Sequence, residues 1–184
     1  SQKYIEQTIK SVINQNYPNL EYIIIDGGST DETLEIIEKY KNKIDILISK
    51  ADKGIYFALN KGLKLASGDI LGWINSDDIL IPGSLFSINK AFSEIKNCHW
   101  ITGIPLNMNE EGILYSTNNN HYRRTYSICE YLNAPPYSIQ QESTFFSREA
   151  YSATSGISTK YKLAGDYDLW AKLYHNNSLF LVNS

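Results

Sequence analysis

Apolar runs and amphipathic segments alternate along the first half of the sequence. Residues 20–26 form a β-rich apolar run without alternation, which is typical of a strand covered on both faces in a parallel sheet. Residues 44–49 and 69–75 are expected to be further strands. Apolar residues at helical spacing predict helices over residues 4–16, 54–68 and 82–95. Residues 1–95 therefore predict an α/β fold with a mainly parallel sheet flanked by helices.

Residues that favour helix ends support these boundaries. Pro18 is expected to end the first helix, and Gly68 is a natural stop for the helix at 54–68. Ser29 and Glu32 have the spacing of a capping box, which predicts another helix that ends near Tyr40.

The second half has a different pattern, and the change near residue 97 predicts two halves of one domain, 1–96 and 97–184. Residues 99–108 and 113–117 flank "NEEG" and predict a hairpin. Residues 117–138 predict a loop or a short helix. Strands are expected at 142–147 and 178–183, with a helix at 166–176 between them.

Size and charge limit the classes of function. A chain of 184 residues is long enough for one domain with a substantial core. A formal net charge of −3 argues against nucleic acid as a partner. The two cysteines, Cys98 and Cys129, form no disulfide framework, which favours a reducing cytoplasm. We identify neither an apolar run long enough to span a membrane nor a signal peptide.

Acidic residues follow each of the three predicted strands, where open α/β sheets bind ligands. They are Asp26, Asp52 and the pair Asp77–Asp78. Divalent cations such as Mg²⁺ and Mn²⁺ commonly use one or two carboxylates together with substrate phosphates. The Asp77–Asp78 pair therefore indicates a metal site, and the two side chains are expected to point in different directions. The alternative is that one of them shapes a turn or caps the next helix.

The other candidates have two interpretations each. Asp26 precedes Gly27 and Gly28, so it could recognise a nucleotide or fix the turn with its own side chain. The spacing is not that of a dinucleotide-binding fingerprint or a P-loop. Asp52 and Lys53 could form an ordinary surface ion pair.

Asp166, at the start of an amphipathic helix, suits a general base or an acid favoured by the helix dipole. Trp170, one turn later, is expected in the core. A small basic patch of His121, Arg123 and Arg124 suits a solvated loop or a contact with the acceptor or a membrane surface.

Three stretches together resemble family 2 glycosyltransferases with the GT-A fold, of the kind that builds bacterial cell-surface polysaccharides. They are "YIEQTIKSVINQNYPNLEYIIIDGGSTDET", "DKGIYFALNKGLKLASGDILGWINSDD" and "QQESTFFSREAY" with "AGDYDLWAKL". The resemblance covers nearly the whole chain and is strongest over residues 4–92 and 140–173. It implies an inverting enzyme that transfers a sugar, with UDP as the expected nucleotide, to a glycan or lipid-linked acceptor.

The resemblance also implies roles for individual residues. Asp77 would be the principal ligand of Mn²⁺ or Mg²⁺, and Asp166 the catalytic base. The remaining positions would contact the donor or the acceptor: Asp26, Gly28, Asp52, Lys53, Asn75, Ser76 and Asp78 for the donor, and Gln141 and Glu142 for the donor sugar or acceptor.

The sequence departs from the family pattern in two ways. Relatives carry a strand before the first helix, whereas this sequence begins at Ser1, so we expect a missing strand beside that of Asp26. Asn75 and Gly165 stand where the DXD and ED motifs have their first acids. Two alternatives to transfer therefore remain open: a sugar-phosphate nucleotidyltransferase and a non-catalytic module that binds sugar nucleotides.

Overall fold

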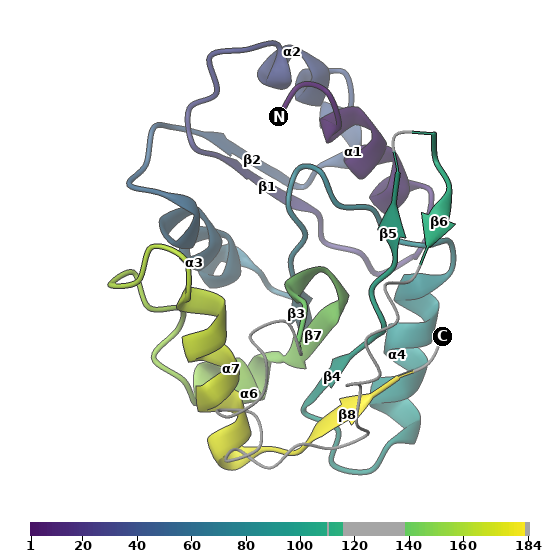
Figure 1. Cartoon of the computed structure of the whole chain (residues 1–184), viewed down its shortest axis with the longest axis vertical. Helices are drawn as coiled ribbons and strands as arrows, with labels where there is room; N and C mark the ends of the chain where they lie inside the picture. Colours follow the sequence, from purple (N-terminus) through teal and green to yellow (C-terminus); the bar gives the residue numbers. More distant parts are fainter. Residues whose placement is uncertain (110, 116–138, 183–184) are drawn as a thin grey trace.

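The strands of the computed structural model, which describes residues 1–109, 111–115 and 139–182, form separate sheets (Figure 1). One is a parallel pair, and another has four strands in the order β3-β7-β4-β8, in which β7 is antiparallel to β3 and β4. A short antiparallel hairpin forms the third. The strands are β1 (Ile23–Asp26), β2 (Ile46–Ser49), β3 (Ile70–Gly72), β4 (Trp100–Thr102), β5 (Asn107–Met108), β6 (Leu114–Tyr115), β7 (Thr144–Ser147) and β8 (Leu179–Leu181).

Every helix that we predict within the described residues is present, with ends shifted by a few residues. Those at 54–68, 82–95 and 166–176 correspond to α3, α4 and α7. The helices are α1 (Ile5–Ile13), α2 (Thr33–Glu38), α3 (Ile55–Leu65), α4 (Ser84–Glu94), α6 (Arg148–Ser152) and α7 (Gly165–Asn176), with 3₁₀ turns η1 (Lys41–Lys43) and η2 (Gln141–Ser143). None of these helices is both long and apolar enough to cross a bilayer. The predicted loop at 117–138, with Cys129 and the basic patch, lies outside the described residues.

Two local predictions are wrong. The third strand was expected to extend the parallel sheet, but β3 pairs antiparallel with β7 in the other sheet. Ser29 and Glu32 form no capping box, because α2 begins only at Thr33 and Glu32 makes no side-chain cap. The Ser29 hydroxyl instead donates to Asp26 Oδ1 at 2.5 Å. Ser29 therefore belongs to the turn that the Asp26 carboxylate holds, and α2 begins too late for Ser29 to cap it.

The smaller core lies between the parallel pair and the first two helices. Ile5 and Ile9 of α1 and Ile37 of α2 are buried together, and Ile24 and Leu47 from the strands pack against them. On the other face of β1, Ile25 lies against Gly62 of α3. β1 is therefore covered on both faces, as its uninterrupted apolar sequence predicts.

The larger core is an aromatic cluster between the four-stranded sheet and α7. Trp170 stacks on Trp73 and on Trp100, with ring centroids 5.4 and 5.9 Å apart. Phe146 of β7 meets Trp170 edge to face. Trp100, Phe146 and Trp170 are at most 1% exposed, so the expectation that Trp170 belongs to the core is confirmed. Stacked and edge-to-face aromatic pairs add about 0.5–1.5 kcal/mol each beyond their burial.

A groove of about 850 Å³ separates β1 from β3. Residues 20–27 line it on one side and residues 68–77 on the other. Within the described residues, β1 pairs with β2 alone and β3 with β7 alone, so each presents an unpaired edge. Helices α1, α3 and α4 add apolar side chains to the lining: Ile5, Val12, Leu59, Leu63, Leu85 and Ile88. The groove therefore has the features of a place for one further strand. The unpaired edges of β1 and β3 lie on its two sides, and apolar side chains of the helices line it.

A further strand in this groove would join the parallel pair to the four-stranded sheet. Ser1 also lines the groove, and its hydroxyl accepts a hydrogen bond from Ser76 Oγ at 2.9 Å. Ser76 follows β3, so a strand that ran parallel to β1 and β3 would end close to Ser1. We predict that a six-residue Val/Ile-rich segment fused before Ser1 raises the melting temperature by about 4–8 °C, or about 2 kcal/mol.

The matched control carries a proline in the middle of the same segment, because proline cannot donate to a central ladder. Thermal unfolding followed by circular dichroism measures the difference. Equal melting temperatures for the two fusions would contradict a strand in this groove.

Candidate functional site

The Asp26 carboxylate organises the loop after β1. Its Oδ2 accepts hydrogen bonds from the amides of Gly28 and Ser29, both at 3.0 Å, and from Ser49 Oγ at 2.6 Å. The parallel register places Ser49 opposite Asp26, which brings this hydroxyl within reach. Burial of Asp26, which is 7% exposed, raises the carboxyl pKa, but the hydrogen bonds outweigh burial and lower its pKa overall. The structure therefore favours the turn-fixing interpretation of Asp26, and donor contact stays a prediction.

The loop after β1 packs closely on the loop after β2. Gly28 has a φ of +92°, and a Cβ there would lie 3.0 Å from the backbone N and Cα of Ala51. A Cβ on Gly27 would lie 3.1 Å from Asp52 Oδ2. Asp52 itself accepts a hydrogen bond from the Gly54 amide at 2.8 Å and lines the groove. Lys53 is exposed and lies outside the residues that line the groove.

The stretch after β3 forms a tight turn in which the two neighbouring acids have different roles. Asp78 Oδ2 accepts a hydrogen bond from the Asn75 amide at 3.0 Å, and the Asp78 amide donates to the Asn75 carbonyl at 3.3 Å. Asp78 thus shapes the turn. Asp77 is exposed and lines the groove, together with Asn75 and Ser76. That the two carboxylates point in different directions stays a prediction.

Glu142 lies close to Asp78, although 64 residues separate them in the sequence. Burial raises the pKa of each carboxyl. The negative charge of Asp78 adds to the rise for Glu142, and that of Asp77 adds to the rise for Asp78. Gln141 and Glu142 belong to η2, directly before β7. The β3–β7 pairing therefore places a cluster of like charges at one end of these strands, which a cation would relieve.

The residues present fit a cation that shares its ligands with a substrate. In residues 1–109, 111–115 and 139–182 no group of three or more His, Cys, Asp or Glu side chains is arranged to hold a metal. Mg²⁺ commonly binds one or two carboxylates plus phosphate oxygens rather than a cage made by the protein alone. The exposed carboxylate of Asp77, at the mouth of the groove, matches that mode.

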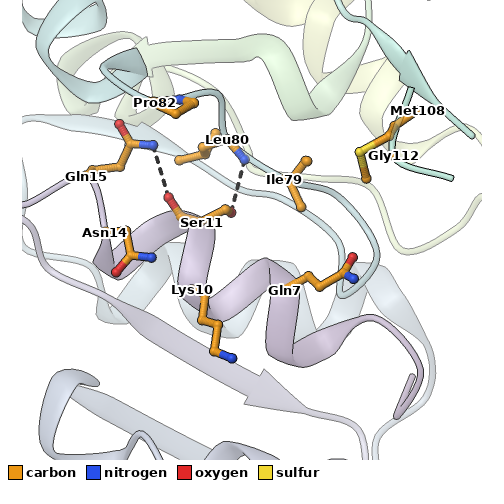
Figure 2. Close-up of a pocket in the computed structure, with 10 residues that line it drawn as sticks. All are labelled: Gln7, Lys10, Ser11, Asn14, Gln15, Ile79, Leu80, Pro82, Met108 and Gly112. Carbon is orange, nitrogen blue, oxygen red and sulfur yellow. Dashed lines mark hydrogen bonds between the residues drawn. The ribbon is translucent and has the colours of Figure 1, made fainter. Parts of the chain in front are cut away.

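Helix α1 fixes the segment that carries these acids. Thr8 Oγ1 donates to the Ser76 carbonyl at 3.0 Å. As Figure 2 shows, the Leu80 amide donates to Ser11 Oγ, at 3.1 Å, and Gln15 turns toward the same segment. Gln15 Nε2 donates to the Ile81 carbonyl at 3.0 Å. A second cavity of about 450 Å³ lies here, and none of the predicted site residues lines it.

Asp166 lies on the first turn of α7, outside the residues that line the groove. Tyr56 Oη donates to its Oδ1 at 3.1 Å. Tyr56 follows Ile55, which lines the groove at the start of α3. Tyr56 therefore connects Asp166, the base predicted from the sequence, to the start of α3, where Ile55 lines the groove.

The groove brings together five of the predicted site residues. They are Asp26, Asp52, Asn75, Ser76 and Asp77. Gly28 and Asp78 support the surrounding loops, while Gln141, Glu142 and Asp166 come from the second half of the chain. The sequence analysis missed Ser49 and Tyr56, which hold Asp26 and Asp166. Both lie within or next to stretches that carry motifs, but only the fold shows what they contact.

Comparisons with known proteins identify the family of the chain. The family model for "Glycosyl transferase family 2" matches residues 1–152. Chondroitin synthase from Escherichia coli is 32% identical over 181 residues, which cover 93% of this chain and 24% of that protein. Hyaluronan synthase from Pasteurella multocida is 32% identical over 180 residues, covering 92% and 17%. The chain thus spans at most about a quarter of the length of these relatives.

Solved structures show the same fold. The structure of Staphylococcus aureus TarS 1-349 in complex with UDP-GlcNAc matches 99% of this chain and 55% of that chain, with a TM-score of 0.76 and 21% identity. Mannosyltransferase PcManGT from Pyrobaculum calidifontis, in complex with GDP-Man and Mn²⁺, matches 100% and 52%, with a TM-score of 0.72 and 17% identity. With the family match over most of its length and this GT-A-like α/β fold, the chain belongs to glycosyl transferase family 2.

Proposed function

We propose that this domain transfers a sugar from a nucleotide-sugar donor, a UDP-sugar first of all, to a glycan or lipid-linked acceptor, with inversion at the anomeric carbon. The observation that carries the proposal is that Asp26, Asp52 and Asp77 all line the groove between β1 and β3. The TarS structure contains UDP-GlcNAc, and the named synthases act in glycosaminoglycan synthesis. Family membership favours glycosyl transfer over nucleotidyl transfer.

The acidic residues that line the groove would repel a diphosphate, so a diphosphate can bind there only together with a cation. Asp77 would hold Mn²⁺ or Mg²⁺, which stabilises the charge of a leaving diphosphate. Asp52 and Ser76, together with Asn75 and Asp26, would line the nucleotide side. Gly28 and Lys53 border that site, and Asp78 keeps the turn in place.

The reaction itself is one displacement. The acceptor hydroxyl oxygen attacks the anomeric carbon, and the bond from that carbon to the diphosphate oxygen breaks. The electron pair leaves with the nucleoside diphosphate, and Asp166 takes the hydroxyl proton as general base. Gln141 and Glu142 would face the sugar or the acceptor. Attack from the side opposite the leaving group inverts the anomeric centre.

The setting of the reaction follows from its substrates. A cytoplasmic site, in peripheral contact with the inner face of a membrane, would bring the domain to lipid-linked acceptors. The domain would then add sugars during cell-surface polysaccharide synthesis, without nucleic acid as a partner.

Metal-dependent binding tests the donor site. We predict that UDP binds in the presence of Mn²⁺ and that Asp77→Ala weakens this binding at least about tenfold, or about 1.4 kcal/mol. The reason is that Asp77 is exposed, lines the groove and follows β3. Isothermal titration calorimetry with UDP and with GDP, with and without Mn²⁺, measures the effect.

Glu94→Ala, which removes an exposed acid from α4 away from the groove, is the control. The titrations are run on this chain and on the chain extended with the Val/Ile-rich strand. The donor site is wrong if neither chain binds either nucleotide, or if Asp77→Ala binds as tightly as the unchanged protein.

Turnover tests the base. UDP release from UDP-GlcNAc, with water as the acceptor, is measured for the unchanged protein and for Asp166→Asn. We predict that the substitution lowers turnover by about 10²–10⁴-fold because the amide cannot accept the proton. The dissociation constant for UDP should change less than about twofold, because Asp166 lies outside the groove.

Asp168→Asn is the matched control, since Asp168 lies on the same helix but pairs with Lys172 at 2.5 Å. UDP-Glc, UDP-GlcA and GDP-Man are tested in parallel. Nucleotide binding without turnover of any donor would favour a non-catalytic module, and equal losses in the two variants would contradict Asp166 as the base.

A further inference from the structure

The side chain that holds Asp166 comes from the other half of the domain. Tyr56, on the first turn of α3, donates its hydroxyl to Asp166 Oδ1 at 3.1 Å, and 110 residues separate the two in the sequence. Tyr56 is partly buried and packs against the aromatic core. A half-buried carboxylate on the first turn of a helix can still adopt several rotamers, and one hydrogen bond from a packed ring limits that freedom.

Because Gly165 has no side chain, the Tyr56 ring of α3 can pack beside Asp166. A Cβ at position 165 would lie 2.9 Å from each of three atoms: Tyr56 Cδ2, Ile157 Cγ2 and the Ser158 carbonyl oxygen. The Ser158 oxygen belongs to the backbone, so this space cannot be opened cheaply. The position beside Asp166 on its own helix therefore cannot carry an acid, or any side chain, while the Tyr56 ring is in place.

The protonation state of Tyr56 suits a permanent donor. Burial raises the pKa of the Tyr56 phenol, and the negative charge of Asp166 adds to the rise, while the backbone amides of Gly165 and Asp166 partly oppose it. The phenol therefore keeps its proton throughout the neutral range. On the same helix, Asp168 and Lys172 form an ion pair at 2.5 Å. The Lys172 ammonium also donates a hydrogen bond to the Gly156 carbonyl at 2.9 Å.

We propose that Tyr56 is a positioning residue for Asp166: its hydroxyl orients the carboxylate and stabilises the ionised form that accepts the proton. This proposal rests on the proposed function of Asp166 as the base. It also assigns a role in the reaction to the start of α3, between the groove-lining Ile55 and helix α7. Donor binding and the base would then be linked through a single rigid turn.

Tyr56→Phe removes only the hydroxyl and keeps the ring that fills the space beside Gly165. We predict that kcat for UDP release from UDP-GlcNAc falls about 10–100-fold while KM changes less than about twofold, because donor contacts are untouched. The acidic limb of the pH–rate profile should move to higher pH by about 0.5–1 unit, since a hydrogen bond to the ionised carboxylate is lost.

Tyr151→Phe is the matched control. Tyr151 also packs against the aromatic core, but its hydroxyl lies 3.4 Å from Asn60 Oδ1 and not near Asp166. Circular dichroism confirms that both variants are folded. The proposal is overturned if Tyr56→Phe keeps the kcat and the acidic limb of the unchanged protein, or if Tyr151→Phe shifts both equally.

A second readout needs no turnover. In protein with ¹³C-labelled aspartate, the Asp166 carboxyl signal is identified by its absence from Asp166→Asn. We predict that its titration midpoint rises in Tyr56→Phe and not in Tyr151→Phe. An unchanged midpoint overturns the positioning role. A shifted midpoint without turnover of any donor supports the contact and counts against the proposed function instead.

Discussion

The antiparallel pairing of β3 with β7 is the constraint on which the site depends. It joins segments 75 residues apart, with Ile70 opposite Ser147 and Gly72 opposite Phe145. At one end, Arg148 donates to the carbonyls of Ala66 and Gly68 and ties the turn before β3 to the start of α6. At the other end, the same register brings Glu142 beside Asp78. A Cβ on Gly72 would lie 2.4 Å from Phe145 Cδ1, so this glycine is needed for the aromatic ring to cross the strand.

The carboxylates around the groove differ in their contacts. Asp26 and Asp78 use their oxygens to hold the loops after β1 and β3. Asp77 lies exposed at the mouth between those loops. Loops held in this way cost less entropy to order when a ligand binds. The adjacent acids at 77 and 78 therefore differ in their surroundings: Asp78 binds the backbone of the turn, and Asp77 is exposed in the groove.

Local pattern predicted the elements of the fold well, because burial on one face leaves a periodic pattern and burial on both faces leaves an uninterrupted apolar run. It could not predict that β3 joins β7, since a short apolar strand carries little information about its register with a distant partner. The expected capping box failed because Ser29 bonds to Asp26 in the turn after β1, and residue spacing alone does not show that α2 begins as late as Thr33. The acidic residues at the strand ends could be predicted as site residues because open α/β sheets bind ligands at the carboxyl ends of their strands. The role of Tyr56 could not be predicted, because its contact with Asp166 joins distant parts of the chain.

The central claim is that a cation and a diphosphate bind at Asp77, which lines the groove between β1 and β3. Crystals of the domain grown with UDP and Mn²⁺ allow the most direct measurement, which is anomalous scattering recorded at the manganese absorption edge. The account predicts one strong peak within bonding distance, about 2.0–2.3 Å, of an Asp77 carboxylate oxygen and of the diphosphate. Ordered UDP without a manganese peak at Asp77, or a peak held by other residues, would contradict it.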